Sequence, residues 1–259
     1  MKKTGIPGKA VLFAVLAALV FYSPFLYAEK NRVTIAIAAN LVPVMDEIRK
    51  EFMAENPGID VEVIPGASGK LAAQIISGAP YDIFASADMD YPEKIKSLGL
   101  AVTGPDVYAE GFLVIFTVRN IDLSKGIAAV KNKQAVRISV ANPGTAPYGR
   151  AAVNALKKAG LYSEVEKKLV YAGNVSQAAQ QIISGTDIGF VARSLMYDRA
   201  MSAYKENINW VVIPEKTAPA LKQAMVLLQK STGNGDAVKL YRFILSKKAK
   251  TIFRRYGYR

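Results

Sequence analysis

The residues that could bind a ligand gather in four short segments, each placed where an expected strand gives way to an expected helix. They are Ala38–Leu41, Gly66–Lys70, Pro143–Gly149 and Gly173–Gln177. The first turn of a helix offers unpaired backbone N–H groups and the positive end of the helix dipole, which together attract anions. In open α/β sheets, ligands lie beside the carboxyl ends of the strands. The four segments therefore predict an anion-binding site, provided that the fold brings them together.

Two side chains in these segments, Asn40 and Ser68, could donate hydrogen bonds to such a ligand. Asn40 carries an amide N–H₂ group, and Ser68 offers both its hydroxyl and its backbone N–H. Asparagine and serine before a helix are also ordinary N-caps, so each position alone has a purely structural explanation. The segment Gly66–Lys70 is too short for a P-loop, which needs a longer spacing between its first glycine and its lysine.

Covalent catalysis finds little support in the composition. The sequence contains no cysteine and no histidine, which excludes thiolate chemistry, a Ser-His-Asp triad and the commonest zinc ligand. A nucleophilic Ser68 would need a lysine base, and Lys70 lies two residues away, a spacing that does not place it for that role on a helix. We therefore expect no catalytic residues.

Three aspartates near the end of an expected strand, Asp82, Asp88 and Asp90, could suggest a Mg²⁺ or Ca²⁺ site. The run Asp88-Met89-Asp90 lacks the rest of a calcium-binding loop. We expect Asp82 and Asp88 to cap helices or hold turns instead, and we predict no cofactor and no site for a free metal ion.

Two α/β units are expected to position the four segments. The first contains strands 33–39, 59–64 and 81–85 with helices 41–55, 70–77 and 91–98. The second contains strands 136–141, 169–171, 188–192 and 211–213 with helices 149–159 and 176–184. Alternation of this kind predicts parallel strands. Two more strands are expected to link the units, and two last helices to return to the first unit. The linking strands are 112–118 and 223–229, and the last helices are 236–245 and 247–256.

The first 28 residues have the pattern of a secretory signal peptide. Lysines precede an apolar run from Ala10 to Tyr22, and a polar stretch begins at Glu29. We place cleavage after Ala28. An uncleaved membrane anchor is the alternative, although the apolar run is short for a span of about 20 residues. A lipid anchor would need a cysteine, which the chain lacks.

The chain is basic, with a formal charge of +13. A basic surface favours solubility, and it also concentrates small anions and steers them inward. Nucleic acid is a familiar partner of such charge, but an exported chain rarely meets it. The basic residues near the end of the chain, such as Lys250 and Arg254, are expected on a solvated helix face. The charge is therefore compatible with an anion receptor, and we expect no nucleic-acid partner.

Several of these segments resemble the periplasmic molybdate-binding proteins. The resemblance starts with Val33–Leu41 and Gly66–Gly69 and is most specific in Gly78–Asp88, with the pattern G-A-P-x-D-x-F-x-S-A-D. Further similar stretches are 142–149, 187–192 and 253–258. The resemblance covers essentially the whole chain after the signal peptide. It implies a type II periplasmic-binding-protein fold of class α/β, in which two lobes joined by two crossover strands close on the anion.

The resemblance also implies which residues hold the ligand. Members of that family bind the anion through neutral donors only. Carried over by position, Asn40 and Ser68 are ligand-binding side chains, and Tyr148 and Val175 donate through their backbone N–H groups. Some members use a tyrosine hydroxyl where this chain has Ala192, and others a threonine hydroxyl where it has Ala39. One donor is therefore missing or is supplied by Tyr148.

The expected division of the chain follows from the same resemblance. Residues 1–28 form the signal peptide, 29–111 the first part of lobe 1, 112–222 lobe 2, and 223–259 the return to lobe 1. We expect a periplasmic, monomeric binding protein, not an enzyme, that captures molybdate or tungstate for an ABC permease in the inner membrane. The only metal it would hold is the one within that oxyanion.

Three other functions are weighed against this prediction. A binding protein for another oxyanion such as sulfate is the main alternative. An exported hydrolase using Ser68 and the effector lobe of a transcription regulator are the others, but the latter would need a DNA-binding segment where the signal peptide lies. A fully deprotonated tetrahedral dianion offers only acceptors, so a site of donors without a carboxylate suits it, whereas protonated phosphate also needs an acceptor.

Overall fold

The computed structural model describes residues 1 and 31–259, so the predicted signal peptide and its cleavage point lie outside the described residues. Residues Asn31–Arg259 form one compact unit, and everything below concerns this unit. No helix within the described residues is long and apolar enough to cross a membrane.

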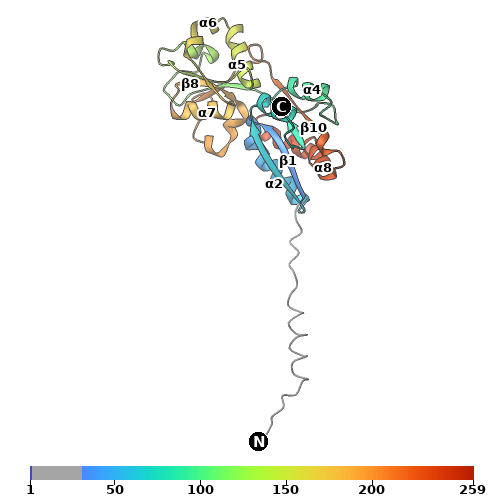
Figure 1. Cartoon of the computed structure of the whole chain (residues 1–259). Helices are drawn as coiled ribbons and strands as arrows, with labels where there is room; N and C mark the ends of the chain where they lie inside the picture. Colours follow the sequence, from blue (N-terminus) through green and yellow to red (C-terminus); the bar gives the residue numbers. More distant parts are fainter. Residues whose placement is uncertain (2–30) are drawn as a thin grey trace. The chain divides into compact units, whose positions relative to one another are not determined.

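The first of two five-stranded sheets has the strand order β2-β1-β3-β10-β4 (Figure 1). Strand β1 runs parallel to β2 and β3, and β10 runs antiparallel to β3 and β4. The strands are β1 Asn31–Ala38, β2 Ile59–Gly66, β3 Ile83–Ala85, β4 Asp106–Gly111 and β10 Leu221–Leu227. Its helices are α2 Val42–Glu55, α3 Ser68–Ile76, α4 Asp90–Ser97, α8 Gly235–Ile244 and α9 Lys247–Arg255. We call this sheet and its helices the first lobe.

The second sheet has the order β7-β6-β8-β5-β9, with β6 parallel to β7 and β8. Its strands are β5 Leu113–Phe116, β6 Ile138–Ala141, β7 Leu169–Ala172, β8 Ile188–Ala192 and β9 Trp210–Val212. Its α-helices are α5 Pro147–Lys158, α6 Tyr162–Val165 and α7 Val175–Ser184. We call this part the second lobe; Figure 1 shows α5 and α7 beside β8. The predicted parallel α/β units are therefore both present.

The side chains of β1 point alternately to the two faces of the first sheet, and helices cover both faces. Val33, Ile35 and Ile37 are fully buried and pack on one face with α2, α8 and α9, whereas Ala36 packs on the other face with α3 and α4. Successive side chains of a strand point to opposite faces, so a continuously apolar strand is buried on both. The carboxyl end of β1 is thereby fixed at the start of the segment that contains Asn40.

The chain passes between the lobes twice. The first passage is at Phe112, between the end of β4 and the start of β5, and the second is at residues 213–220, between β9 and β10. The two predicted linking strands are present as β5 and β10, each directly after a passage. Strand β4 is not among the predicted strands, and it pairs with β10 in the first sheet. Both passages therefore lie next to the same pair of strands.

Candidate anion-binding site

All four predicted ligand-binding residues line one cavity between the lobes. Asn40 and Ser68 come from the first lobe, and Tyr148 and Val175 from the second. The other lining residues are Ala38, Ala39, Gly66, Ala67, Ala87, Ala146, Pro147 and Asn174. The four strand-to-helix segments thus converge, as an anion site requires. Hydrogen bonds join the lobes around the cavity, among them Ser194 Oγ to Asn40 O at 2.9 Å, so the two lobes are closed around it.

The cavity wall carries no charged side chain. The lining residues with polar side chains are Asn40, Ser68, Asn174 and Tyr148. A larger hollow, of about 470 Å³, lies on the surface of the first lobe and is lined by charged residues that include Arg32, Asp60 and Glu62. That hollow has acceptors as well as donors. The interlobe cavity combines helix N-termini with a wall free of carboxylates, which is the environment that suits a dianion.

Helix N-termini point at the cavity from both lobes. Helix α3 begins at Ser68, α5 at Pro147 and α7 at Val175. Ser68 is the first helical residue rather than the N-cap, and it makes no capping bond. Its Oγ instead accepts a hydrogen bond from the backbone N of Ala87 at 3.1 Å. The hydroxyl proton of Ser68 therefore remains for a ligand.

Asn40 is likewise not the N-cap that its position suggested. Its side chain turns into the first lobe, where Nδ2 donates to Gln223 Oε1 and to Tyr258 Oη, both at 2.9 Å. Its backbone oxygen accepts from Ser194 Oγ of the second lobe at 2.9 Å. The capping expectation is wrong because a buried network engages the amide. Capping is found at Asn174 instead, whose Oδ1 accepts from the backbone N of Gln177 at 2.9 Å.

The hydroxyl of Tyr148 does not replace the hydroxyls that are absent at Ala39 and Ala192. Tyr148 Oη accepts from Gln223 Nε2 at 3.0 Å, so the ring is directed away from the cavity centre toward the first sheet. Burial raises the pKa of Tyr148 well above its usual value, with a smaller contribution from Tyr258. The tyrosine is therefore neutral, and its backbone N–H at the start of α5 is the group left to bind an anion.

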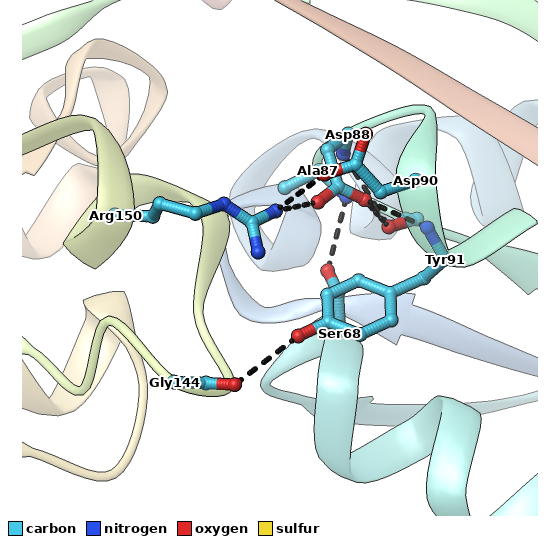
Figure 2. Close-up of polar contacts among 8 residues, drawn as sticks. Ser68, Ala87, Asp88, Asp90, Tyr91, Gly144 and Arg150 are labelled. Carbon is cyan, nitrogen blue, oxygen red and sulfur yellow. Dashed lines mark hydrogen bonds and ion pairs between the residues drawn. The ribbon is translucent and has the colours of Figure 1, made fainter. Parts of the chain in front are cut away.

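A polar cluster beside the cavity joins the two lobes (Figure 2). Arg150 of α5 forms an ion pair with Asp88 and a second one with Asp90 at 3.1 Å. Its guanidinium carbon lies 5.7 Å from the ring centroid of Tyr91, whose hydroxyl donates to Gly144 O at 3.3 Å. We call these contacts the latch. Asp88 of the latch directly follows Ala87, whose backbone N–H donates to Ser68 Oγ.

Asp88 holds a turn as predicted, whereas Asp82 connects segments far apart in the chain instead of capping a helix or holding a turn. Asp88 accepts from Ser86 Oγ at 2.7 Å and from the backbone N of Tyr91 at 3.4 Å, which holds the turn into α4. Burial raises the pKa of Asp88, against the lowering effects of Ser86 and Arg150. Asp82 ties β1 to the chain before α8 by accepting from the backbone N of Thr34 and from Ser231 Oγ. Within residues 31–259, no group of three or more acidic side chains is placed to hold a metal ion.

Two more hydrogen bonds join the lobes, and in both the acceptor is a backbone oxygen. The N–H of Gly69 donates to Thr145 O at 2.8 Å, and Ser176 Oγ donates to Ala39 O at 3.0 Å. A β-carbon at Gly69 would lie 3.0 Å from that Thr145 oxygen and 2.4 Å from Tyr91 Oη. Sequence reasoning identified neither the latch nor these contacts. The sequence signal for these contacts is position, since Gly69 directly follows the predicted ligand residue Ser68 and Arg150 lies two residues after Tyr148.

Two mixed sheets, two passages between them and a closed site at the carboxyl ends of the strands define a two-lobed binding protein with the type II periplasmic-binding-protein fold. The sequence matches the family described as bacterial extracellular solute-binding protein over residues 33–259. The chain belongs to this family.

Comparison with known proteins agrees with this assignment. The chain is 35% identical to the molybdate-binding protein ModA of Rhodobacter capsulatus, over 89% of each protein. It is 33% identical to ModA of Azotobacter vinelandii, over 89% of this chain and 91% of that protein. The solved structure of the Azotobacter vinelandii periplasmic molybdate-binding protein superimposes with a TM-score of 0.80 at 29% identity, covering 88% of this chain and 98% of that one.

Proposed function

We propose that this protein captures molybdate in the periplasm and delivers it to an ABC permease in the inner membrane. The observation that carries the proposal is the interlobe cavity, whose wall is built from helix N-termini and neutral side chains and holds no carboxylate. A dianion that only accepts hydrogen bonds suits such a wall. The molybdate-binding proteins to which the chain is similar support the choice of anion.

The ligand contacts of the proposal come from both lobes. Ser68 donates through its hydroxyl and backbone N–H, Asn40 through its amide, and Tyr148 and Val175 through their backbone N–H groups. An anion that bridges the lobes favours the closed arrangement, since it gains contacts there that an open arrangement lacks. We assign residues 29–111 and 223–259 to lobe 1 and 112–222 to lobe 2, in a monomer exported by the signal peptide 1–28.

Tungstate is the second ligand of the proposal, because it has the same charge and tetrahedral shape. Sulfate is smaller, so its exclusion depends on the size of the closed cavity. A hydrolytic role for Ser68 is not part of the proposal. Its Oγ accepts a hydrogen bond from the backbone N–H of Ala87, and none of the residues that line the cavity with it has a basic or acidic side chain to activate the hydroxyl.

Calorimetric titration of the chain from Glu29 onward with molybdate, tungstate, sulfate and phosphate tests the proposal. Residues 31–259 form one compact unit that includes all four proposed ligand residues. We expect saturable one-to-one binding of molybdate and tungstate, with sulfate much weaker. Tight sulfate binding would keep the class of protein and change the ligand, and no binding of any of the four anions would refute the function.

Replacement of Ser68 with alanine should weaken molybdate binding about 10- to 100-fold, which corresponds to one hydrogen bond to a charged group. Ser68 is 1% exposed, so no solvent compensates for the lost donor. The control is Ser97→Ala, since Ser97 Oγ donates to Lys94 O at an exposed position of the first lobe. Equal affinities of Ser68→Ala and the wild type would remove Ser68 from the ligand set.

Replacement of Arg150 with glutamine should open the latch. We expect molybdate to dissociate about tenfold faster while its association rate changes little, because the ion pairs exist only in the closed arrangement and are partly exposed. Stopped-flow fluorescence of the tryptophan and tyrosines can follow both rates. The matched control is Arg242→Gln on α8. If Arg150→Gln slowed association and left dissociation unchanged, the latch would act on ligand entry instead of closure.

A further inference from the structure

A buried hydrogen-bond network lies behind the cavity wall and connects its two sides through one side chain. Gln223 of β10 is fully buried. Its Oε1 accepts from Asn40 Nδ2 at 2.9 Å and from Tyr108 Oη at 3.0 Å, and its Nε2 donates to Tyr148 Oη at 3.0 Å. Gln223 does not line the cavity, yet it contacts two residues that do, one from each lobe.

With the two amides oriented in this way, the donors and acceptors of the network do not match in number. Tyr108 carries one hydroxyl proton but faces two acceptors, Gln223 Oε1 and Ser86 O, the latter at 2.7 Å. Asn40 Oδ1 is buried and has no hydrogen-bond partner among residues 31–259. Tyr148 Oη accepts from Gln223, and no acceptor for its own proton is found among residues 31–259. A buried acceptor without a donor costs about 1–3 kcal/mol.

Rotating both amides by 180° balances the network while the other side chains stay in place. The nitrogen and oxygen of an amide occupy nearly equivalent positions, and hydrogen bonding decides between them. After rotation, Tyr148 donates to Gln223 Oε1, and Gln223 Nε2 donates to Tyr108 Oη and to Asn40 Oδ1. Tyr108 then gives its single proton to Ser86 O.

The remaining partner of Asn40 also adapts to this rotation. Tyr258 Oη donates to the backbone oxygen of Asn40 at 3.0 Å and lies 2.9 Å from the side-chain amide. Its proton can turn to the rotated Oδ1, because the backbone oxygen keeps its bond from Ser194 Oγ. The rotation thus pairs every buried group of the network except Asn40 Nδ2, which is left for a ligand. It also places Asn40 Nδ2 where the unpartnered oxygen stood.

We propose that Gln223 is a positioning residue that turns the amide of Asn40 so that Nδ2 donates to the bound oxyanion, a role that rests on the proposed function. Asn40 lines the cavity, and the polar atom not used by the network is the one available to a ligand. An amide oxygen there would repel a dianion, whereas an N–H₂ group binds it.

The same orientation discriminates between anions. Asn40 Oδ1 facing the cavity would accept a proton from a partly protonated anion such as hydrogen phosphate, whereas Nδ2 facing the cavity offers no acceptor. Tyr108 and Tyr148, which contact Gln223 on either side, keep the amide in this orientation. Burial raises the pKa values of Tyr108 and Tyr148 well above their ordinary values, so both keep the protons that the arrangement needs.

Nuclear magnetic resonance of the wild-type protein tests the orientation directly. The side-chain N–H₂ signals of Asn40, assigned by their loss in Asn40→Ala, should shift strongly when molybdate is added. Molybdate that binds and shifts the backbone amides of Tyr148 and Val175 but leaves the Asn40 N–H₂ signals in place would overturn the proposal. Failure of the wild type to bind any oxyanion would refute the proposed function itself, and this inference with it.

A double-mutant cycle tests the role of Gln223. Gln223→Met keeps the length of the side chain and removes its hydrogen bonds, and we expect about tenfold weaker molybdate binding with a smaller loss for phosphate. In an Asn40→Ala background the same change should have no further effect, because Gln223 acts through Asn40. Equal losses in both backgrounds would show that Gln223 supports the fold alone.

Removal of one hydroxyl provides a matched pair of variants. Tyr108→Phe removes the acceptor that fixes Gln223 Nε2, so molybdate binding should weaken severalfold. Tyr241→Phe is the control, because its hydroxyl bonds to Asp106 and Thr103 and has no part in the network. Thermal unfolding of each variant confirms that it folds. Equal affinities of the two variants would contradict the role of Tyr108 in orienting the amides.

Discussion

Replacing Gly149 with alanine is expected to destabilise the protein by about 3 kcal/mol or more and to abolish anion binding. The new β-carbon would lie 1.9 Å from the carbonyl oxygen of Ala141 and 2.6 Å from its carbonyl carbon. These are backbone atoms of β6, which cannot rotate away as a side chain could. Helix α5 would have to move off the second sheet and carry the backbone N–H of Tyr148 with it.

Urea unfolding measures the free-energy difference, and Gly58→Ala is the control. No atom lies within 4 Å of a β-carbon at Gly58, so the control should change the free energy of unfolding little. A Gly149→Ala protein with wild-type stability and wild-type molybdate affinity would show that the contact between α5 and β6 is not as tight as described.

Replacing Gly69 with valine is expected to weaken molybdate binding at least about 100-fold while the ligand-free protein stays folded. A β-carbon there would crowd Tyr91 Oη and, across the junction, the backbone oxygen of Thr145. The side chain of Tyr91 can turn aside, whereas Thr145 O can move only with the second lobe. The substitution therefore acts against closure.

Calorimetry and thermal unfolding with and without molybdate separate these effects. The matched control is Ala73→Val, an exposed position on the same helix α3. We expect Gly69→Val to lose the stabilisation by molybdate that the control retains. Wild-type affinity in Gly69→Val would mean that the anion binds without the contact between Gly69 and Thr145.

The segments that build the site could be predicted from the sequence because their signals are local. The apolar run of β1 and the spacing of Val44, Ile48 and Phe52 on α2 specify a strand and a helix around Asn40, and Gly66–Lys70 marks the next turn. Parallel strands place such turns at one edge of a sheet. The four segments meet at one cavity because each lobe forms an α/β sheet that places its segments at the same edge.

The connections across the lobes could not be predicted, because they join residues far apart in the chain. Arg150 meets Asp88 across 62 positions, and Gln223 meets Asn40 across 183. Asn40 also shows why a local rule fails. Its place before α2 suits a cap, but burial beside Gln223 and Tyr258 gives its amide stronger partners than the helix does. Strand β4 was missed since its sequence alternates weakly and it is partly exposed.

A crystal structure of the protein with tungstate, located by the anomalous scattering of tungsten, tests the central claim most directly. We predict one tungsten peak in the interlobe cavity, with oxygens within hydrogen-bond distance of Ser68 Oγ and of the backbone nitrogens of Tyr148 and Val175. No carboxylate should contact the anion. A peak elsewhere, such as the basic hollow formed by Lys250 and Arg254, with the interlobe cavity free of tungsten, would contradict the account.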